Sequence, residues 1–353
     1  MKRNVLIIGN SYSLDCHKYV SKIAESMGVE LDVHLLQKGG GKIKEIYDHR
    51  DCAFFDYRIN DVGQSGAAAS APVDGGTGCY TLSEILETKN FDTVVLQNYW
   101  GSSEGILHYK DSGSETDCSP AYEDLAEWVK ARQPDARVMI NAVWSNEIGC
   151  NYSDKVRSAA ADAGFTGEGG ECDFYYDTLE RYNGQAAIDI GKRINGDSSP
   201  VEQMPVGYAV QLARNFVDEN GLDRYRTGFF NLAGVPDQSI LPLLPKDSKA
   251  GRLRLNRDGF HLSYAGRYRV GLVWVQMLTG MDIRKCTYVP EPESLRCGVQ
   301  KITKTIDIVN INFERLSDKD AANLRELAYL ACRNFTRLPP RGLDGEAVPF
   351  VYR

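Results

Sequence analysis

The chain lacks the features that mark membrane, nucleic-acid-binding and zinc proteins. Its 353 residues contain no run of about eighteen apolar residues, so the sequence predicts no membrane-spanning helix. The formal net charge is -7 and no basic stripe is visible, so a nucleic-acid partner is not expected. None of the nine cysteines forms a Cys-x-x-Cys pair, which argues against a structural zinc site. There is no Walker pattern and no Gly-x-Gly-x-x-Gly, which argues against a nucleotide-binding site. No metal or organic cofactor is implied by the sequence.

The cysteines and the N-terminus bear on where the protein works. An odd number of cysteines leaves at least one thiol free or paired between chains, and mostly reduced thiols are expected in a soluble cytoplasmic protein. One or two disulfides fit an exported one. Residues 1–4 run directly into the apolar stretch Val5 to Ile8, which is too short for the core of a signal peptide. We therefore expect a cytoplasmic protein, or an exported protein whose signal peptide is absent from this chain.

Short apolar runs alternate with segments of helical periodicity. The expected strands span residues 4–8, 31–36, 92–97, 137–144 and 204–207. The expected helices span residues 14–27, 82–88, 122–132, 208–219 and 264–278, with one more in the tail after Ser317 as its cap. The region near 63–78 is predicted to be a loop, and residues 146–199 are predicted to form long loops with short helices. This alternation predicts an α/β sheet covered by helices on both faces.

Ser11 follows the first expected strand, in Gly9-Asn10-Ser11. In an open parallel sheet, ligands bind outside the carboxyl ends of the strands, so this hydroxyl is expected at the mouth of a site. The N-terminus of the next helix favours negative charge there, on a nucleophile or on an oxyanion. The same pattern also fits a serine that only caps its helix.

Asp258 and His261 form the second candidate group. In Asp258-Gly259-Phe260-His261 the carboxylate can hold one ring nitrogen while the other faces a serine. Chance also produces such short spacings. The other four histidines lack this context and are expected at surface or core positions: His17, His34, His49 and His108.

Taken together, these blocks resemble the SGNH/GDSL hydrolases, with Gly-Asn-Ser where the family commonly has Gly-Asp-Ser. More specifically the chain resembles an uncharacterised branch of them, over about residues 4 to 280. The blocks that carry the resemblance are Leu6–Ser13, Val94–Gln97, Pro205–Ala209 and Asp258–Tyr268. The resemblance implies a three-layer α/β/α sandwich with a flavodoxin-like, doubly wound, five-stranded parallel sheet.

The resemblance also implies roles. Ser11 attacks an acyl carbonyl, His261 takes and returns the proton, and Asp258 orients His261. The family's oxyanion hole combines the nucleophile's own N–H, a glycine N–H after the second strand and a side-chain amide after the third. Gly40 fits the glycine position, with Gly39 and Gly41 as alternatives, although a plain turn also explains these glycines. Where the family usually has Gly-x-Asn, this chain has Gln97-Asn98-Tyr99, so Gln97 or Asn98 is the expected amide donor.

Aromatic side chains near the expected strand ends are candidates for stacking on a sugar or lining an acyl pocket, and core packing is the equal alternative. They are Tyr12, Tyr99, Trp100 and Trp144. The resemblance implies a serine esterase of small O-acyl esters, above all an O-acetylesterase on carbohydrate. An inactive carbohydrate-binding protein, a lipase or thioesterase, and a flavodoxin-like phosphate or nucleotide binder are the alternatives.

The expected partner is a small-molecule or carbohydrate ester, and the oligomeric state is left open. We expect one hydrolase domain over residues 1–285, with loop insertions at about 50–80 and 145–200. Residues 286–353 then form an extension whose single helix packs on that domain.

Overall fold

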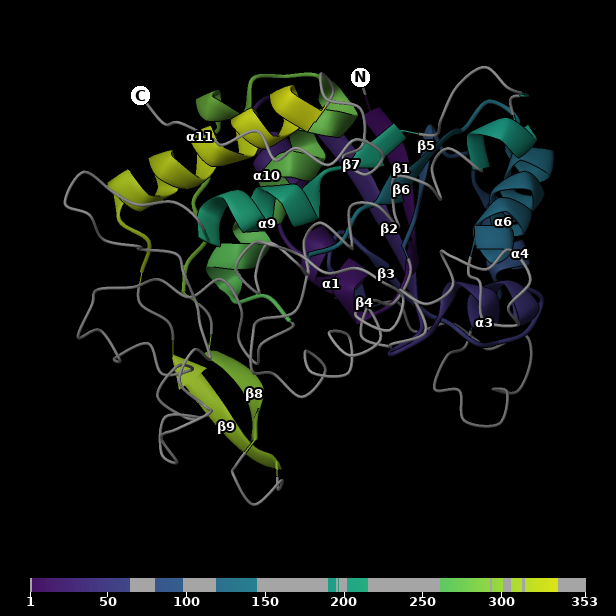
Figure 1. The fold of residues 1–353 in the computed structure, drawn as a ribbon, viewed down its shortest axis with the longest axis horizontal. Coiled ribbons are helices and arrows are strands. Elements are labelled where there is room, and N and C mark those ends of the chain that lie inside the picture. The colour runs from purple at the N-terminus through teal and green to yellow at the C-terminus, as the bar shows by residue number, and fades with distance from the viewer. Residues whose placement is uncertain are drawn as a thin grey trace, which may run out of the picture.

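A central sheet organises the computed structural model, which describes residues 2–63, 80–97, 119–144, 190–194, 196, 202–214, 261–292, 294–300, 306–312 and 315–335. The sheet has seven strands in the order β4-β3-β2-β1-β5-β6-β7 (Figure 1). Their bounds are β1 Lys2–Gly9, β2 Glu30–Gln37, β3 Asp56–Ile59, β4 Val62–Gly63, β5 Thr93–Leu96, β6 Arg137–Asn141 and β7 Glu202–Met204.

Five neighbouring strands, β2-β1-β5-β6-β7, are parallel and form the core of this sheet. In chain order they read 2-1-3-4-5, which is the flavodoxin-like doubly wound order, with β1 and β5 on either side of the point where the winding reverses. Val5 to Ile8 on β1 are essentially inaccessible to solvent, as expected of a strand covered on both faces. The fold expectation holds, but the sheet is wider than the five strands expected, because β3 and β4 add antiparallel to β2.

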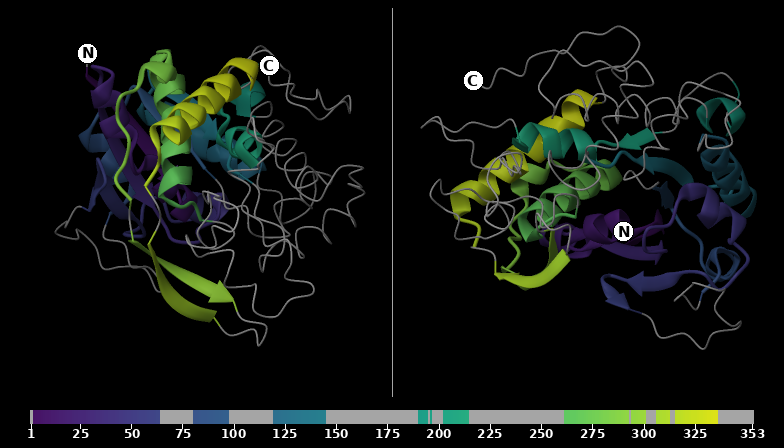
Figure 2. Two further views of the ribbon diagram at one scale, coloured as in Figure 1. Left: turned by 90° about the vertical axis from the view of Figure 1, so that its left-hand side faces the viewer. Right: turned by 60° about the horizontal axis from the view of Figure 1, so that its bottom comes forward.

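Helices cover both faces of the sheet (Figures 1 and 2). One layer contains α1 Ser11–His17, α2 Val20–Ser26, α9 Val206–Arg214, α10 Tyr264–Thr279 and α11 Asp318–Phe335. The other contains α3 Ile43–Asp48, α4 Leu82–Thr88 and α6 Ser119–Arg132. None of the described helices is long and apolar enough to cross a membrane.

The segment expected as one helix over 14–27 is two helices. The chain turns at Lys18 and Tyr19, between α1 and α2, and Gly28 ends α2 with a positive φ of 75°. The turn brings the end of α1 to a hairpin that the sequence analysis took for part of a loop insertion. There the His17 Nε2 accepts a hydrogen bond from the Asp61 backbone N–H at 3.0 Å, and Lys18 forms an ion pair with Asp61 at 2.5 Å.

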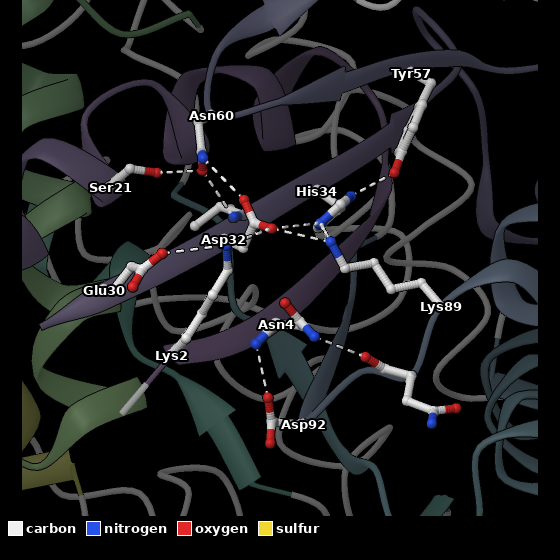
Figure 3. A network of polar contacts seen from close by, with 12 residues as sticks. Lys2, Asn4, Ser21, Glu30, Asp32, His34, Tyr57, Asn60, Lys89 and Asp92 are labelled. Atoms are coloured by element: carbon white, nitrogen blue, oxygen red, sulfur yellow. Dashed lines mark hydrogen bonds and ion pairs between the residues drawn. The ribbon is translucent and has the colours of Figure 1, made fainter.

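Asn60 and Asp61 form the two-residue turn of that β3–β4 hairpin, with φ of 47° and 69°. A two-residue hairpin turn with both φ values positive is of type I′, which favours asparagine and aspartate. The Asn60 side chain also ties the hairpin to β2. Its amide donates to Asp32, and its oxygen accepts from the Val33 N–H and the Ser21 hydroxyl (Figure 3).

Asp32 and His34 on β2 form the centre of a polar network at this edge of the sheet (Figure 3). Lys89, just after α4, donates to both Asp32 at 2.9 Å and the His34 Nε2 at 2.8 Å. The Tyr57 hydroxyl on β3 contacts the other nitrogen of His34. Burial is the main reason that the pKa of His34 falls to about 4, and the Lys89 charge lowers it further. The network joins β2, β3 and α4 and lies apart from the carboxyl ends of the parallel strands.

The last third of the described chain packs around α10. Ser263 caps its N-terminus by accepting the Gly266 N–H, and Gly280 ends it with a φ of 73°. The tail helix α11 lies against α10 and α9, and Ser317 caps it by accepting the Asp320 N–H at 3.1 Å. In the sequence between α10 and α11, β8 Ser294–Gln300 and β9 Ile306–Asn312 form an antiparallel two-stranded hairpin that the sequence patterns did not predict.

Candidate active site

Ser11 lies at the carboxyl end of the central strand β1. The strand ends at Gly9, Asn10 caps the next helix by accepting the Tyr12 N–H at 3.1 Å, and Ser11 is the first residue of α1. The tight exit from the strand requires glycine, because a Cβ on Gly9 would lie 2.2 Å from the Ser13 hydroxyl oxygen. Ser11 therefore occupies the place where an open α/β sheet binds its ligands.

His261 reaches Ser11 across the fold. Its Nε2 lies 2.9 Å from the Ser11 Oγ, although the two residues are 250 positions apart in the sequence. This is hydrogen-bonding distance between a hydroxyl and an imidazole, the contact that a serine nucleophile requires of its base. The helix α10 begins three residues after His261 and holds the end of that segment.

The side chains of Asn10 and Gln97 form a buried network beneath Ser11. Gln97, just after β5, donates from its Nε2 to the Asn10 Oδ1 at 2.9 Å, and its Oε1 accepts from the Ser13 hydroxyl. Asn10 in turn donates from its Nδ2 to the Gly41 carbonyl oxygen at 3.0 Å. Both amides are fully buried. The network joins the ends of β1 and β5 to the glycine turn that follows β2.

Gly40 lies in that turn, with a φ of 69°. The Gly41 N–H closes the turn on the Lys38 carbonyl at 2.9 Å, and the Lys38 N–H bonds the Gly9 carbonyl at 3.0 Å. Gly39 and Gly40 are exposed, whereas Gly41 is buried. The two sides of the turn, Lys38 and Gly41, are therefore hydrogen-bonded to Gly9 and Asn10, the residues that precede Ser11. Gly40 lies at the exposed side of this turn.

The rings of Tyr12 and Trp144 pack against each other inside the fold instead of facing solvent. Both side chains are fully buried, with ring centroids 4.9 Å apart, and the Tyr12 ring lies 5.9 Å from that of His261. A fully buried ring offers no face to a sugar. Of the two roles weighed for them in the sequence, the structure shows core packing.

Four of the residues singled out in the sequence lie outside the described part of the chain: Asp258, Asn98, Tyr99 and Trp100. Sequence reasoning gave no role to the Asn10 side chain, nor to Asp15 and Arg267, which form a buried ion pair beside the site with 2.8 Å between Nη2 and Oδ1. Asn10 stands next to the serine, which was the available signal. Within the described ranges, no group of histidine, cysteine and acidic side chains is placed to hold a metal ion.

Solved protein structures similar to this one are known, whereas comparisons of the sequence give no match. No protein-family model matches the sequence, and no curated protein matches it. The structure is similar to that of a DUF4886 family protein from Bacteroides uniformis, with a TM-score of 0.59 at 17% identity over 98% of each chain. A protein from Parabacteroides merdae described as a GDSL-like lipase has a TM-score of 0.40 at 10% identity, covering 79% of this chain and 95% of that one.

The acetyl xylan esterase AlAXEase has a TM-score of 0.37 at 13% identity, covering 78% of this chain and 99% of that one. The α/β/α sandwich with a doubly wound parallel core, which the sequence resemblance implied, is confirmed by the observed strand order and by the likeness to the DUF4886 family protein.

Proposed function

We propose that this chain is a serine esterase that hydrolyses small O-acyl esters through an acyl-enzyme intermediate. The observation that carries the proposal is the 2.9 Å contact between the Ser11 Oγ and the His261 Nε2 at the carboxyl end of the central strand. A hydroxyl is a weak nucleophile until an adjacent base accepts its proton, and the imidazole is in place to do so.

The reaction proceeds in two halves. His261 accepts the Ser11 proton as the Oγ attacks the acyl carbonyl, and the same Nε2 then protonates the departing alcohol oxygen. Water, deprotonated by His261, next attacks the acyl-enzyme, and the proton returns to Ser11 as the acid leaves. Asp258 is assigned by the sequence resemblance to hold the imidazole in the tautomer whose Nε2 is free of a proton.

Backbone N–H groups supply the charge stabilisation in this proposal. The Ser11 N–H belongs to the first turn of α1, where helical N–H groups have no acceptor within the helix and favour negative charge. The Gly40 turn lies beside it through the Asn10–Gly41 hydrogen bond. Because the Gln97 amide donates to Asn10, we assign Gln97 the role of positioning the residues between β1 and α1. We assign the side-chain amide of the oxyanion hole to Asn98.

We propose a carbohydrate O-acetyl ester as the substrate, and this assignment rests on the resemblance of the sequence blocks. Tyr12 and Trp144 are not part of the proposed sugar contact, because both side chains are fully buried. Tyr99 and Trp100 remain assigned to it. A lipase is a weaker alternative because the sequence shows no long apolar lid segment.

One observation favours a second candidate, a carbohydrate-binding protein that keeps the sheet without the reaction. The third-strand block departs from the usual Gly-x-Asn, and the amide at its first position, Gln97, is engaged with Asn10. Losing one oxyanion-hole donor typically costs about a hundredfold or more in turnover.

A fluorophosphonate probe separates the two candidates. We expect it to label the wild type and not Ser11→Ala, while Ser21→Ala, which removes a hydroxyl that donates to Asn60 in the hairpin turn, keeps wild-type labelling. A folded wild type that resists the probe contradicts the esterase and favours binding. Acetylated sugars compared with nitrophenyl esters of increasing chain length then test the substrate. Cleavage of long chains alone contradicts the carbohydrate assignment and leaves the hydrolase intact.

A further inference from the structure

A buried carboxylate joins the helix of Ser11 to the segment of His261. Asp15 lies four residues after Ser11 on α1, on the same side of the helix, and its side chain is completely buried. A buried carboxylate is costly unless it is paired and hydrogen-bonded. The hydrogen-bond and ion-pair partners of Asp15 therefore show which parts of the fold this carboxylate connects.

Two groups that bind the Asp15 carboxylate belong to the segment that follows His261. The Leu262 backbone N–H donates to the Asp15 Oδ2 at 2.7 Å. The Nε and Nη2 of Arg267, in the first turn of α10, both lie 2.8 Å from the Asp15 Oδ1. The Arg267 side chain is only 7% exposed, so the ion pair is shielded from water and salt.

We infer that Asp15 and Arg267 are positioning residues for the Ser11–His261 pair, an inference that rests on the proposed function. The Oδ2 of Asp15 binds the backbone N–H of Leu262, the residue after His261. The Oδ1 of Asp15 binds Arg267 in the first turn of α10. The nucleophile and its base are 250 positions apart in the sequence, and the contacts of Asp15, which we call the clamp, join helix α1 of the nucleophile directly to the segment of the base. Displacing a reacting group by about 1 Å typically costs about a hundredfold in rate.

The clamp predicts an effect on rate that is separable from its effect on stability. Asp15→Asn keeps an oxygen for the Leu262 N–H but leaves the Arg267 charge buried without a counter-charge, so a large loss of stability is expected. The double variant Asp15→Leu with Arg267→Met removes both charges. Replacing a buried ion pair by apolar side chains of similar volume is often neutral for stability, and the link to Leu262 is still lost.

The experiment measures thermal stability, the rate of fluorophosphonate labelling and the kcat and KM for nitrophenyl acetate, using the whole chain. Asp61→Asn is the matched control, since it removes the ion pair with Lys18, the residue that follows α1, and asparagine tolerates the positive φ of that turn. We expect the double variant to melt near the wild type with a kcat lower by about ten- to a hundredfold at nearly unchanged KM. The control is expected to keep the wild-type kcat.

The outcomes separate the clamp from the enzyme assignment. A stable double variant with wild-type kcat overturns the clamp and leaves the esterase standing. If the double variant does not fold, Asp15→Asn decides: a lower kcat per folded molecule than Asp61→Asn supports the clamp, and an equal one overturns it. A folded wild type that neither reacts with the probe nor cleaves the ester overturns both proposals.

Discussion

The side-chain amide of Asn10 donates a hydrogen bond to the carbonyl oxygen of Gly41 at 3.0 Å. A carbonyl only accepts, so this contact needs a donor, which asparagine has and an ionised aspartate lacks. The other end of the same side chain accepts from Gln97 and from the Tyr12 N–H. The asparagine of Gly-Asn-Ser therefore has a physical reason in this chain, where the commoner Gly-Asp-Ser would place a carboxylate against the Gly41 carbonyl.

Asn10→Asp tests this relationship by restoring the commoner motif. We expect a loss of about 1 to 3 kcal/mol in the free energy of unfolding, because a buried acceptor replaces a donor. We also expect the kcat to fall by about tenfold as the glycine turn shifts. Asn4→Asp at the amino end of the same strand, where the amide donates to Asn90 at 3.1 Å, is the control and is expected to keep the wild-type kcat. An active, stable Asn10→Asp protein contradicts the assignment.

Ser11 and His261 are expected to act as one unit in kinetics. Ser11→Ala and His261→Ala each lower the kcat by about a thousandfold or more, and the double variant is no slower than the slower single one, because either loss removes the same step. Steady-state hydrolysis of nitrophenyl acetate by the three variants measures this. Multiplying effects in the double variant show that the two groups act independently and count against the mechanism.

Trp144 distinguishes a packing role from a substrate role. Because the ring is fully buried against Tyr12, Trp144→Phe is expected to lower the free energy of unfolding by roughly 1 to 3 kcal/mol and to leave the KM unchanged. Chemical denaturation and steady-state kinetics measure the two quantities. Trp128→Phe, at a partly exposed position of α6, is the control with little expected change in either. A raised KM at unchanged stability restores the sugar-stacking hypothesis.

Acid is expected to destabilise the fold through His17. Burial is the chief reason that its pKa falls from 6.5 to about 4. Between these two values the unfolded chain binds a proton that the folded chain does not, so stability is lost as the pH falls through this window. The contribution at pH 5 is about 2 kcal/mol.

His17→Gln removes the titrating group while leaving an oxygen that can accept the Asp61 N–H. We expect its free energy of unfolding to fall less steeply than that of the wild type between pH 7 and pH 5, measured by urea denaturation at each pH. The pKa of His34 also falls to about 4, so the unfolded chain binds a second proton in this pH range. The free energy of unfolding of the variant is therefore still expected to fall with pH, but less steeply. Identical slopes in the variant and the wild type exclude His17 as a source of acid sensitivity.

The parallel core was predictable because it depends on local patterns. The short apolar run Val5 to Ile8 indicates a buried strand, and Ser317 caps the tail helix as its sequence context predicts. The break at Lys18 and Tyr19 was missed because the apolar periodicity continues across it. The hairpin was missed although Asn60-Asp61 is a turn signal, since the loop composition that follows outweighed it.

The sequence predicted the site residues whose side chains can act as a nucleophile or as a base. Ser11 and His261 stood out by motif order, and their meeting is a property of the whole fold. The burial of Tyr12 and Trp144 was not predictable, because an aromatic ring at a strand end fits either the core or the rim. Nor was the engagement of Gln97 with Asn10, which depends on how the ends of β1 and β5 face each other.

The separation of 250 positions between the hydroxyl and its imidazole has a consequence during synthesis. At translation speeds of about 5 to 20 residues per second, the growing polypeptide carries the first helix for tens of seconds before the matching histidine is added. Every nascent chain is inert over that interval, however much of the sheet has already formed. In the proposed mechanism, hydrolysis begins only after the segment with His261 has been made and has docked, so a truncated chain that carries the Gly-Asn-Ser motif without His261 is expected to be inactive.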